Sequence, residues 1–178
     1  MNYKLIKANQ EDLLTINILV ENNIDHDLVY TLNYLKYLYN LENYLILKLE
    51  DNLKIIGVII LKLEDNLNHI AYFIIDKEYQ RKGLGSFILK NIKKYNSNKI
   101  TLNVNTKNIK AINFYKKNGF NIKRINKQYY SNKDDSYYMI FENNNTTEHF
   151  YLKKKRKNKS ILILLIIIYF IIKFKNLI

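Results

Sequence analysis

The sequence predicts one domain of mixed α/β class, in which a mostly antiparallel sheet is flanked by helices. Apolar segments of strand length alternate with amphipathic segments of helical period, and three strand candidates in mid-chain are separated only by short turn-rich stretches. Hydrophobic residues make up 48% of the 178 residues, which is enough to build a core. Layers of this kind form when helices cover the apolar faces of a sheet.

The first half of the chain predicts a strand, two helices and an antiparallel meander. Tyr3–Lys7 is the first strand, and a helix follows from about Gln10 to Val20. Asn9 is its expected N-cap, with Asp12 at the position where a capping box usually has Glu or Gln. A second helix is expected over Val29–Tyr39. The meander consists of the strands Tyr44–Leu49, Lys54–Lys62 and His69–Ile75.

The second half alternates between helices and strands. Gly119 is expected to end the second of these helices. The predicted elements are the helix Leu84–Tyr95, the strand Lys99–Val104, the helix Ile109–Asn118, and the strands Phe120–Ile125 and Tyr137–Phe141. The full order is β-α-α-β-β-β-α-β-α-β-β, and the domain is expected to span residues 1–143.

Composition excludes several classes of function. The chain has no Cys, so disulfides and thiolate metal sites are excluded, and the polar start Met1–Gln10 predicts no cleavable signal and a cytoplasmic domain. The net charge is +13, but residues 151–178 hold eight Lys/Arg and no acid. The remaining lysines are dispersed, so no nucleic-acid partner is expected. His26 and His149 lie far from any motif, and no metal site is expected.

Two of the four glycines, Gly83 and Gly85, lie between an apolar strand and an amphipathic helix, beside Arg81 and Lys82. Free N–H groups at a helix start favour an anionic ligand such as a phosphate. A dinucleotide fingerprint would need a third glycine where Ile88 stands, and a P-loop would need a lysine between glycine and serine. A plain tight turn before a helix is the remaining alternative.

The stretch from His69 to Phe120 resembles the acetyl-CoA-binding core of the GNAT acetyltransferase superfamily. Residues Ile74–Gly85 resemble its strand-turn-helix signature, Gln/Arg-x-x-Gly-x-Gly/Ala, and Asn108–Phe120 resemble its second signature of Asn, Ala, Tyr and a terminal Gly-Phe. The resemblance implies that acetyl-CoA is the acetyl donor and that a bulged strand exposes amides to its pantetheine arm and thioester. The residues it places at the donor are Ile74, Ile75, Gln80, Arg81, Lys82, Gly83, Leu84, Gly85, Ser86, Asn108 and Tyr115.

The resemblance also implies the catalytic residues. Tyr115 stands where the family places a tyrosine that protonates the departing CoA thiolate, and its alternative role is a core aromatic. Asn108 can also act as a helix N-cap. The related ribosomal-protein alanine acetyltransferases have a Glu where this chain has Asn103, so His69, acting through water, is the substitute base. A surface histidine at a strand entrance is the alternative for His69.

The segment Lys127–Met139 resembles the Tyr-Tyr, loop, Asp-Ala-x-x-Met pattern of protein amino-terminal acetyltransferases, with Ser136 in place of Ala. That resemblance implies that Tyr129 and Tyr130 line the acceptor entrance and that a protein amino terminus is the partner. At neutral pH the deprotonated fraction is also far larger for α-amines than for lysine side-chain amines. Acetylation of a small-molecule amine is the enzymatic alternative, and a catalytically weak, membrane-tethered acyl-CoA-binding module is the other.

The end of the chain predicts a membrane-associated tail. Residues 144–160 read as a polar and basic linker, and residues 161–172 contain no polar side chain except that of Tyr169. A helix of that length covers about 18 Å, short of the ~30 Å hydrocarbon core. The basic run suits anionic lipid on the cytoplasmic side, so residues 161–178 are expected to contact membrane lipid, either spanning it or lying on it. Packing against the domain or a partner is the alternative.

Overall fold

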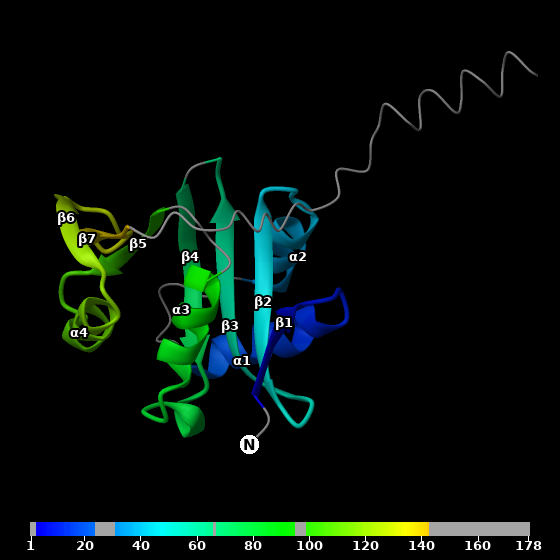
Figure 1. Ribbon diagram of the computed structural model, residues 1–178. Helices are drawn as coiled ribbons and strands as arrows, with labels where there is room; N and C mark the ends of the chain where they lie inside the picture. Colours follow the sequence, from blue (N-terminus) through cyan, green and yellow to red (C-terminus); the bar gives the residue numbers. More distant parts are fainter. Residues whose placement is uncertain (1–2, 24–30, 66, 95–98, 143–178) are drawn as a thin grey trace, which may run out of the picture.

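The computed structural model describes residues 3–23, 31–65, 67–94 and 99–142, and it confirms the mixed α/β class (Figure 1). The elements are β1 (Tyr3–Lys7), α1 (Asp12–Asn23), α2 (Leu32–Asn40), β2 (Tyr44–Asp51), β3 (Lys54–Leu63), β4 (Leu67–Ile75), α3 (Leu84–Lys94), β5 (Lys99–Asn105), α4 (Ile109–Lys117), β6 (Asn121–Asn126) and β7 (Ser136–Phe141). Their order is the predicted one. The predicted linker and tail, as well as His26 and His149, lie outside the described residues.

In the described residues the strands form one seven-stranded sheet with the order β1-β2-β3-β4-β5-β7-β6. The pair β4–β5 is parallel, and the other neighbouring strands are antiparallel. The last strand, β7, lies between β5 and β6, so the connection from β5 through α4 to β6 crosses over the position of β7, and β6 and β7 form a hairpin. This crossover brings the loop between β6 and β7 to the same end of the sheet as the end of β5.

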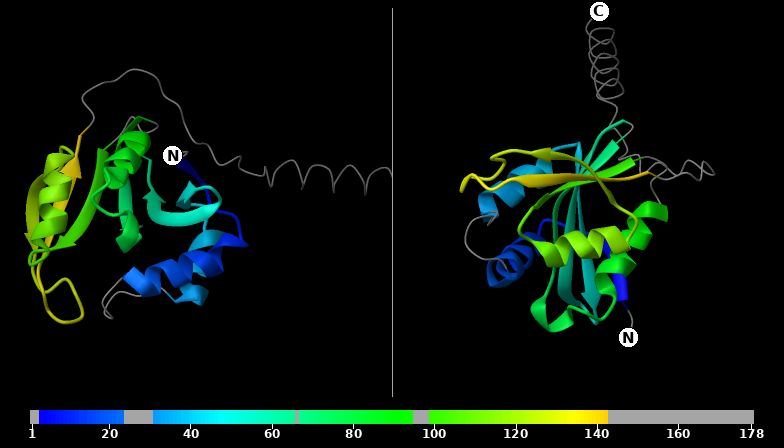
Figure 2. Two further views of the ribbon diagram at one scale, coloured as in Figure 1. Left: turned by 90° about the horizontal axis from the view of Figure 1, so that it is seen from below. Right: turned by 90° about the vertical axis from the view of Figure 1, so that its left-hand side faces the viewer.

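Helices cover both faces of the sheet. Helix α3 lies in front of the sheet in Figure 1, with α1 and α2 behind it, and the view from below in Figure 2 shows the same separation. One core cluster includes buried residues of α3 and α4 with Leu102 and Met139, whereas the other includes residues of α1 and α2 with Val58 and Ile74. We call these the α3/α4 face and the α1/α2 face.

The start of α1 confirms the predicted capping box. The Asn9 N–H donates to an Asp12 carboxylate oxygen at 2.7 Å, and the Asp12 N–H donates to the Asn9 side chain at 3.0 Å. The other Asp12 oxygen accepts from Lys48 Nζ at 2.7 Å, and Glu50 lies 2.6 Å from the same ammonium. The two carboxylates raise the pKa of Lys48 even though burial opposes this shift. The N-terminal end of α1 is therefore held to β2 by an ion triad.

A splay between β4 and β5 is the feature that shapes the centre of the molecule. The parallel pairing runs from Leu67 opposite Lys99 to Ile70 opposite Leu102, and it ends there. In the same region the register between β3 and β4 shifts at a bulge, where Ile60 and Leu61 oppose Tyr72 and Ile70. A bulge bends a strand, so the second half of β4 turns away from β5.

Among residues 3–142, the described parts contain no group of three or more His, Asp or Glu side chains arranged to hold a metal ion. The same parts contain no helix with both the length and the hydrophobicity needed to cross a bilayer.

Candidate active site

A turn between β4 and α3 forms the first part of the site. After the 3-10 helix Lys77–Tyr79, the Gln80 side-chain amide donates to the Ile75 carbonyl at 2.9 Å and holds the turn to the end of β4. Arg81 and Gly83 both have left-handed backbones, with φ of 59° and 81°. Left-handed residues in alternation with right-handed ones make successive N–H groups converge into an anion-binding concavity.

The start of α3 adds donors to this turn. The Phe87 N–H donates to the Gly83 carbonyl at 3.0 Å, so the amides of Leu84, Gly85 and Ser86 precede this intrahelical bond. Amides in that position lie at the positive end of the helix dipole. A Cβ added to Gly83 would meet nothing within 4 Å, so the space in front of the turn is open. These features fit a diphosphate.

Cations surround the turn. Arg81 and Lys82 are exposed beside it, and the Lys82 ammonium lies 5.0 Å from the centre of the Tyr79 ring. Lys54 of β3 lies 5.1 Å from the centre of the same ring. Because Tyr79 contacts both ammonium groups, it fixes positive charge next to the concavity.

Gly85 allows close packing beneath the turn. A Cβ at this position would lie 2.9 Å and 3.0 Å from two ring carbons of Phe114 in α4, and 3.8 Å from a ring carbon of Phe73 in β4. The Phe73 and Phe114 ring centres are 6.0 Å apart. Gly85 is a signature residue and Phe114 lies within the second matching segment, but the sequence carries no signal for Phe73, whose contacts depend on the splay.

The register of β4 decides which of its amides face the splay. The Asp76 N–H donates to the Ile56 carbonyl at 2.9 Å, and the register from that pair through Phe73 is unbroken. Because hydrogen bonds alternate along an antiparallel strand, the Ile74 N–H also points to β3, whereas those of Phe73 and Ile75 point toward the splay. The Ile74 side chain is buried in the α1/α2 cluster. Of the two amides predicted for the donor, this register directs that of Ile75 toward the opening.

Tyr115 of α4 lies on the α3/α4 face. Its ring contacts those of Phe114 and Phe120, with centres 5.1 Å and 5.5 Å away, and it packs against the core cluster. Burial raises the pKa of Tyr115 far above its usual value, and the neighbouring Tyr130 acts in the same direction. The phenol therefore keeps its proton throughout the physiological range and can donate it. Asn108 caps the same helix, with its side chain accepting from the Ala111 N–H at 3.0 Å.

His69 lies on the opposite face, in the paired part of β4. Its Nδ1 is 3.0 Å from the hydroxyl oxygen of Thr101, which is fully buried. Burial lowers the pKa of His69, Lys62 lowers it further, and Glu64 opposes the shift. The imidazole is therefore neutral at neutral pH and could accept a proton. Because strand side chains alternate between faces, His69 and Asn103 both lie on the α1/α2 face.

Asn103 and the predicted acceptor tyrosines form one group at the end of β5. The Asn103 amide donates to the Tyr129 hydroxyl at 3.1 Å, and its carbonyl oxygen accepts from the Asn126 amide at 2.9 Å. The rings of Tyr129 and Tyr130 meet edge to face with centres 5.1 Å apart. Burial, Tyr129 and Asp134 together raise the pKa of Tyr130 to about 12. The sequence did not point to Asn126, because its contact with Asn103 depends on the crossover of β7.

The predicted residues are divided between the two faces. The turn, Ile75, Tyr115 and Asn108 lie on the α3/α4 face, whereas His69 lies on the α1/α2 face beside Thr101. Tyr129 contacts Asn103 and Tyr130, and Tyr130 is also a neighbour of Tyr115. The pairing of β4 with β5 ends at Ile70 and Leu102, so beyond these residues no hydrogen-bonded ladder separates the two faces.

A family model described as an acetyltransferase (GNAT) domain matches residues 22–133. This match covers more than half of the chain. The chain belongs to the GNAT acetyltransferase family. This GNAT protein is accordingly an acyltransferase that uses acetyl-CoA as the acetyl donor, and the resemblance drawn from the sequence motifs is confirmed. No curated protein sequence matches the chain.

Solved structures of GNAT enzymes share the fold. The ribosomal-protein-S18-alanine N-acetyltransferase from Escherichia coli aligns with a TM-score of 0.71 and 22% identity over 85% of this chain and 100% of that one. Arabidopsis thaliana NAA60 in complex with acetyl-CoA aligns with a TM-score of 0.69 and 17% identity over 81% of this chain and 100% of that one. A spermidine N-acetyltransferase chimera from Vibrio cholerae and hSSAT aligns with a TM-score of 0.68 and 23% identity over 80% of this chain and 96% of that one. The similarity of these structures to the chain concerns the fold.

Proposed function

We propose that this GNAT enzyme acetylates the α-amine of a protein N-terminus. The observation that carries the proposal is the charge state of the acceptor loop between β6 and β7. Both of its carboxylates are neutralised, because Lys107 pairs with Asp134 and Lys127 Nζ lies 2.8 Å from Asp135. An acceptor such as spermidine carries several positive charges and needs free carboxylates to hold them. A peptide terminus brings one amine and a chain of polar amides.

The position of Asn103 supports the same choice. An amide cannot remove a proton at neutral pH, so the family's carboxylate base is missing. At neutral pH roughly a tenth of α-amines are already deprotonated, against well under a thousandth of lysine amines. An α-amine therefore needs the least help from a base. His69, neutral and held by Thr101, would accept the remaining proton through a water molecule.

Donor binding would use the α3/α4 face. The amides from Arg81 to Ser86 would hold the diphosphate, with the cations around the turn adding favourable potential. The N–H groups of Phe73 and Ile75 would bind the pantetheine arm and the thioester oxygen. Bound in this way, the donor supplies an activated acetyl group. Asn108 lies at the start of α4, where its capping role is compatible with a contact to the donor.

The reaction then needs one bond formed and one broken. The α-amine nitrogen attacks the thioester carbon, and strand amides stabilise the negative charge that develops on the oxygen. The carbon–sulfur bond breaks, and Tyr115 gives its proton to the departing sulfur. The proton lost by the amine passes through water to His69 or to solvent. The phenolate left on Tyr115 then takes up a proton from solvent, which its raised pKa favours, and the phenol is restored for the next cycle.

The domain limits and the tail belong to the same proposal. We infer that residues 1–143 form the catalytic domain, that 144–160 link it to the tail, and that 161–178 attach it to anionic membrane lipid from the cytoplasmic side. The support is the basic and apolar pattern of the sequence. Attachment would place the enzyme near membrane-bound or nascent acceptors.

A peptide panel tests the acceptor. Full-length protein is mixed with acetyl-CoA and with one peptide in two forms, one with a free α-amine and an internal lysine, the other with a blocked terminus. Mass spectrometry should find one acetyl group on the terminus of the free peptide and none on the blocked one. Acetylation of the lysine or of spermidine, with the free terminus ignored, would refute the proposal. Binding of CoA without turnover would favour the binding-module alternative.

Tyr115→Phe tests the assigned acid. Turnover should fall by roughly a hundredfold or more, because a positioned proton donor contributes about 10² to 10⁴. The dissociation constant for CoA, measured by calorimetry, should stay within about twofold. Tyr39→Phe, in the α1/α2 cluster, is the control and should leave both quantities unchanged. An undiminished rate in Tyr115→Phe would remove its role.

A further inference from the structure

Asn103 joins three separate elements through its side-chain amide. It is half-buried at the end of β5 and donates to Tyr129 Oη at 3.1 Å. Its carbonyl oxygen accepts from Asn126 Nδ2 of β6 at 2.9 Å and from the Ser136 hydroxyl of β7 at 3.4 Å. One side chain thus links the sheet to the acceptor loop.

The network uses both the donor and the acceptor group of the Asn103 amide. An Asn side chain offers donor and acceptor groups at once, whereas an ionised carboxylate only accepts. Ser136, which is fully buried, also receives a bond from Asn126 at 3.4 Å. Asn103 and Ser136 are the two positions at which the chain departs from the acetyltransferase pattern, and they contact each other. The two departures are therefore parts of one arrangement.

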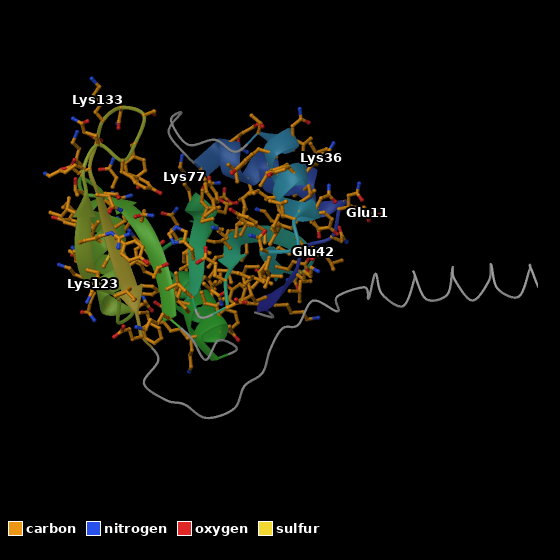
Figure 3. All side chains as sticks on the ribbon, turned by 90° about the horizontal axis from the view of Figure 1, so that it is seen from above. Glu11, Lys36, Glu42, Lys77, Lys123 and Lys133 are labelled. Carbon is orange, nitrogen blue, oxygen red and sulfur yellow. The ribbon has the colours of Figure 1, made fainter. Side chains whose placement is uncertain are left out.

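The loop between β6 and β7, which Asn103 contacts, is held in shape mainly by hydrogen bonds between its own residues. The Tyr130 N–H donates to the Asp134 carbonyl at 3.1 Å, and the Lys133 N–H donates to the Tyr130 carbonyl at 2.8 Å. Figure 3 shows Lys133 on this loop, extending on the same side of the sheet as Lys36 of α2. Tyr129, which is 49% exposed, is the loop residue that Asn103 binds. Its ring in turn packs edge to face against Tyr130.

We propose that Asn103 is a positioning residue, which fixes Tyr129 and through it the acceptor loop at the mouth of the splay. Where the family has a base that removes a proton, this chain has an amide whose hydrogen bond to Tyr129 sets the shape of the acceptor entrance. The inference rests on the proposed function, because the acceptor is assigned to the side of the sheet where this loop lies. It assigns Asn103 to acceptor recognition and gives it no role in binding the donor.

A double-mutant cycle tests the coupling. Asn103→Ala and Tyr129→Phe should each lower kcat/KM for the peptide roughly three- to tenfold, the range expected for one neutral hydrogen bond, mainly through the KM of the peptide. The KM of acetyl-CoA should not change. The kcat/KM of the double variant should be no lower than that of the less active single variant, because both substitutions remove the same bond. Effects that multiply, or an equal rise in the KM of acetyl-CoA, would overturn the proposal.

A second measurement works without turnover. Amide hydrogen exchange in the full-length protein should become faster at Tyr130 and Lys133 in both Asn103→Ala and Tyr129→Phe. Asn121→Ala, an exposed asparagine of the neighbouring β6, is the control and should leave exchange in the loop unchanged. Unchanged exchange in Asn103→Ala would overturn the positioning role. If no peptide is acetylated by the wild type, the proposed acceptor fails, but the exchange experiment still decides the role of Asn103.

Discussion

Gly85 and Gly83 stand two residues apart, and the structure predicts that replacing each by alanine fails for a different reason. In Gly85→Ala, the new Cβ would lie 2.9 Å from a ring carbon of Phe114, closer than carbon atoms pack. Overpacking of this kind costs about 1–3 kcal/mol, and the better helix propensity of alanine offsets up to about 1 kcal/mol. The net destabilisation is about 0–3 kcal/mol, or up to roughly 12 °C in Tm for a domain of this size.

In Gly83→Ala the added methyl meets nothing, but the backbone φ of 81° is costly for any residue with a Cβ. The strain is about 1–2 kcal/mol. If the free turn relaxes to escape this strain, the cost reappears on binding, so the dissociation constant for CoA should rise roughly five- to thirtyfold. Calorimetry with CoA therefore separates the two variants where thermal unfolding alone does not.

Phe114→Leu provides the decisive control, because it shortens the side chain that a Cβ at position 85 would meet. In Gly85→Ala the second substitution should recover part of the lost stability, so that the double variant is more stable than the sum of the single effects predicts. In Gly83→Ala it should recover nothing. Additive losses in the pair with Gly85→Ala would show that the contact between α3 and α4 does not limit this position.

Three further outcomes are expected. Lys48→Met should lower the free energy of unfolding in urea by about 3 kcal/mol, because it leaves the carboxylates of Asp12 and Glu50 without their cation. Lys62→Met removes an exposed pair with Glu64 and should leave the urea midpoint nearly unchanged. Equal shifts in the two variants would contradict this reasoning. Burial lowers the pKa of His69, so below about pH 6.5 the unfolded chain binds more protons than the folded one. The wild type should therefore lose stability relative to His69→Gln as the pH falls from 7.5 to 5.5, and a difference that is flat or opposite in sign would contradict the burial of the imidazole. On cell fractionation, the full-length protein should sediment with membranes and a chain ending at residue 150 should not; full-length protein found wholly in the soluble fraction would end the membrane proposal.

The order of elements could be predicted from the sequence because each element carries a local signal. The capping box at Asn9 and Asp12, the turn residues of the meander and the glycine pair all act within a few residues. The 3-10 helix Lys77–Tyr79 was not predicted, since three residues are too few to show a helical period. Local patterns also predicted the turn between β4 and α3, because its residues form one continuous segment.

The contacts around Asn103 and the acceptor loop could not be predicted from the sequence in the same way. The crossover that inserts β7 between β5 and β6 brings Asn126 to Asn103, and no periodicity encodes this pairing. The register of β4 relative to β3 likewise decides that the amides of Phe73 and Ile75, and not that of Ile74, face the splay. Both results depend on strand pairing between distant segments, where a shift of one residue reverses the direction of every group.

In the proposed mechanism the splay gives the two faces of the sheet separate tasks. A regular parallel pair would satisfy the amides of β4 and close the sheet, so no group could pass between the donor face and the acceptor face. Here the pairing stops at Ile70 and Leu102, while Asn103, the next residue of β5, turns its side chain to the acceptor loop. The residue that follows the last paired position is therefore the natural place either for a base or for a positioning group. In this chain the amide network around Asn103 supports the second role, and a substrate that already carries a neutral amine suits a site built in this way.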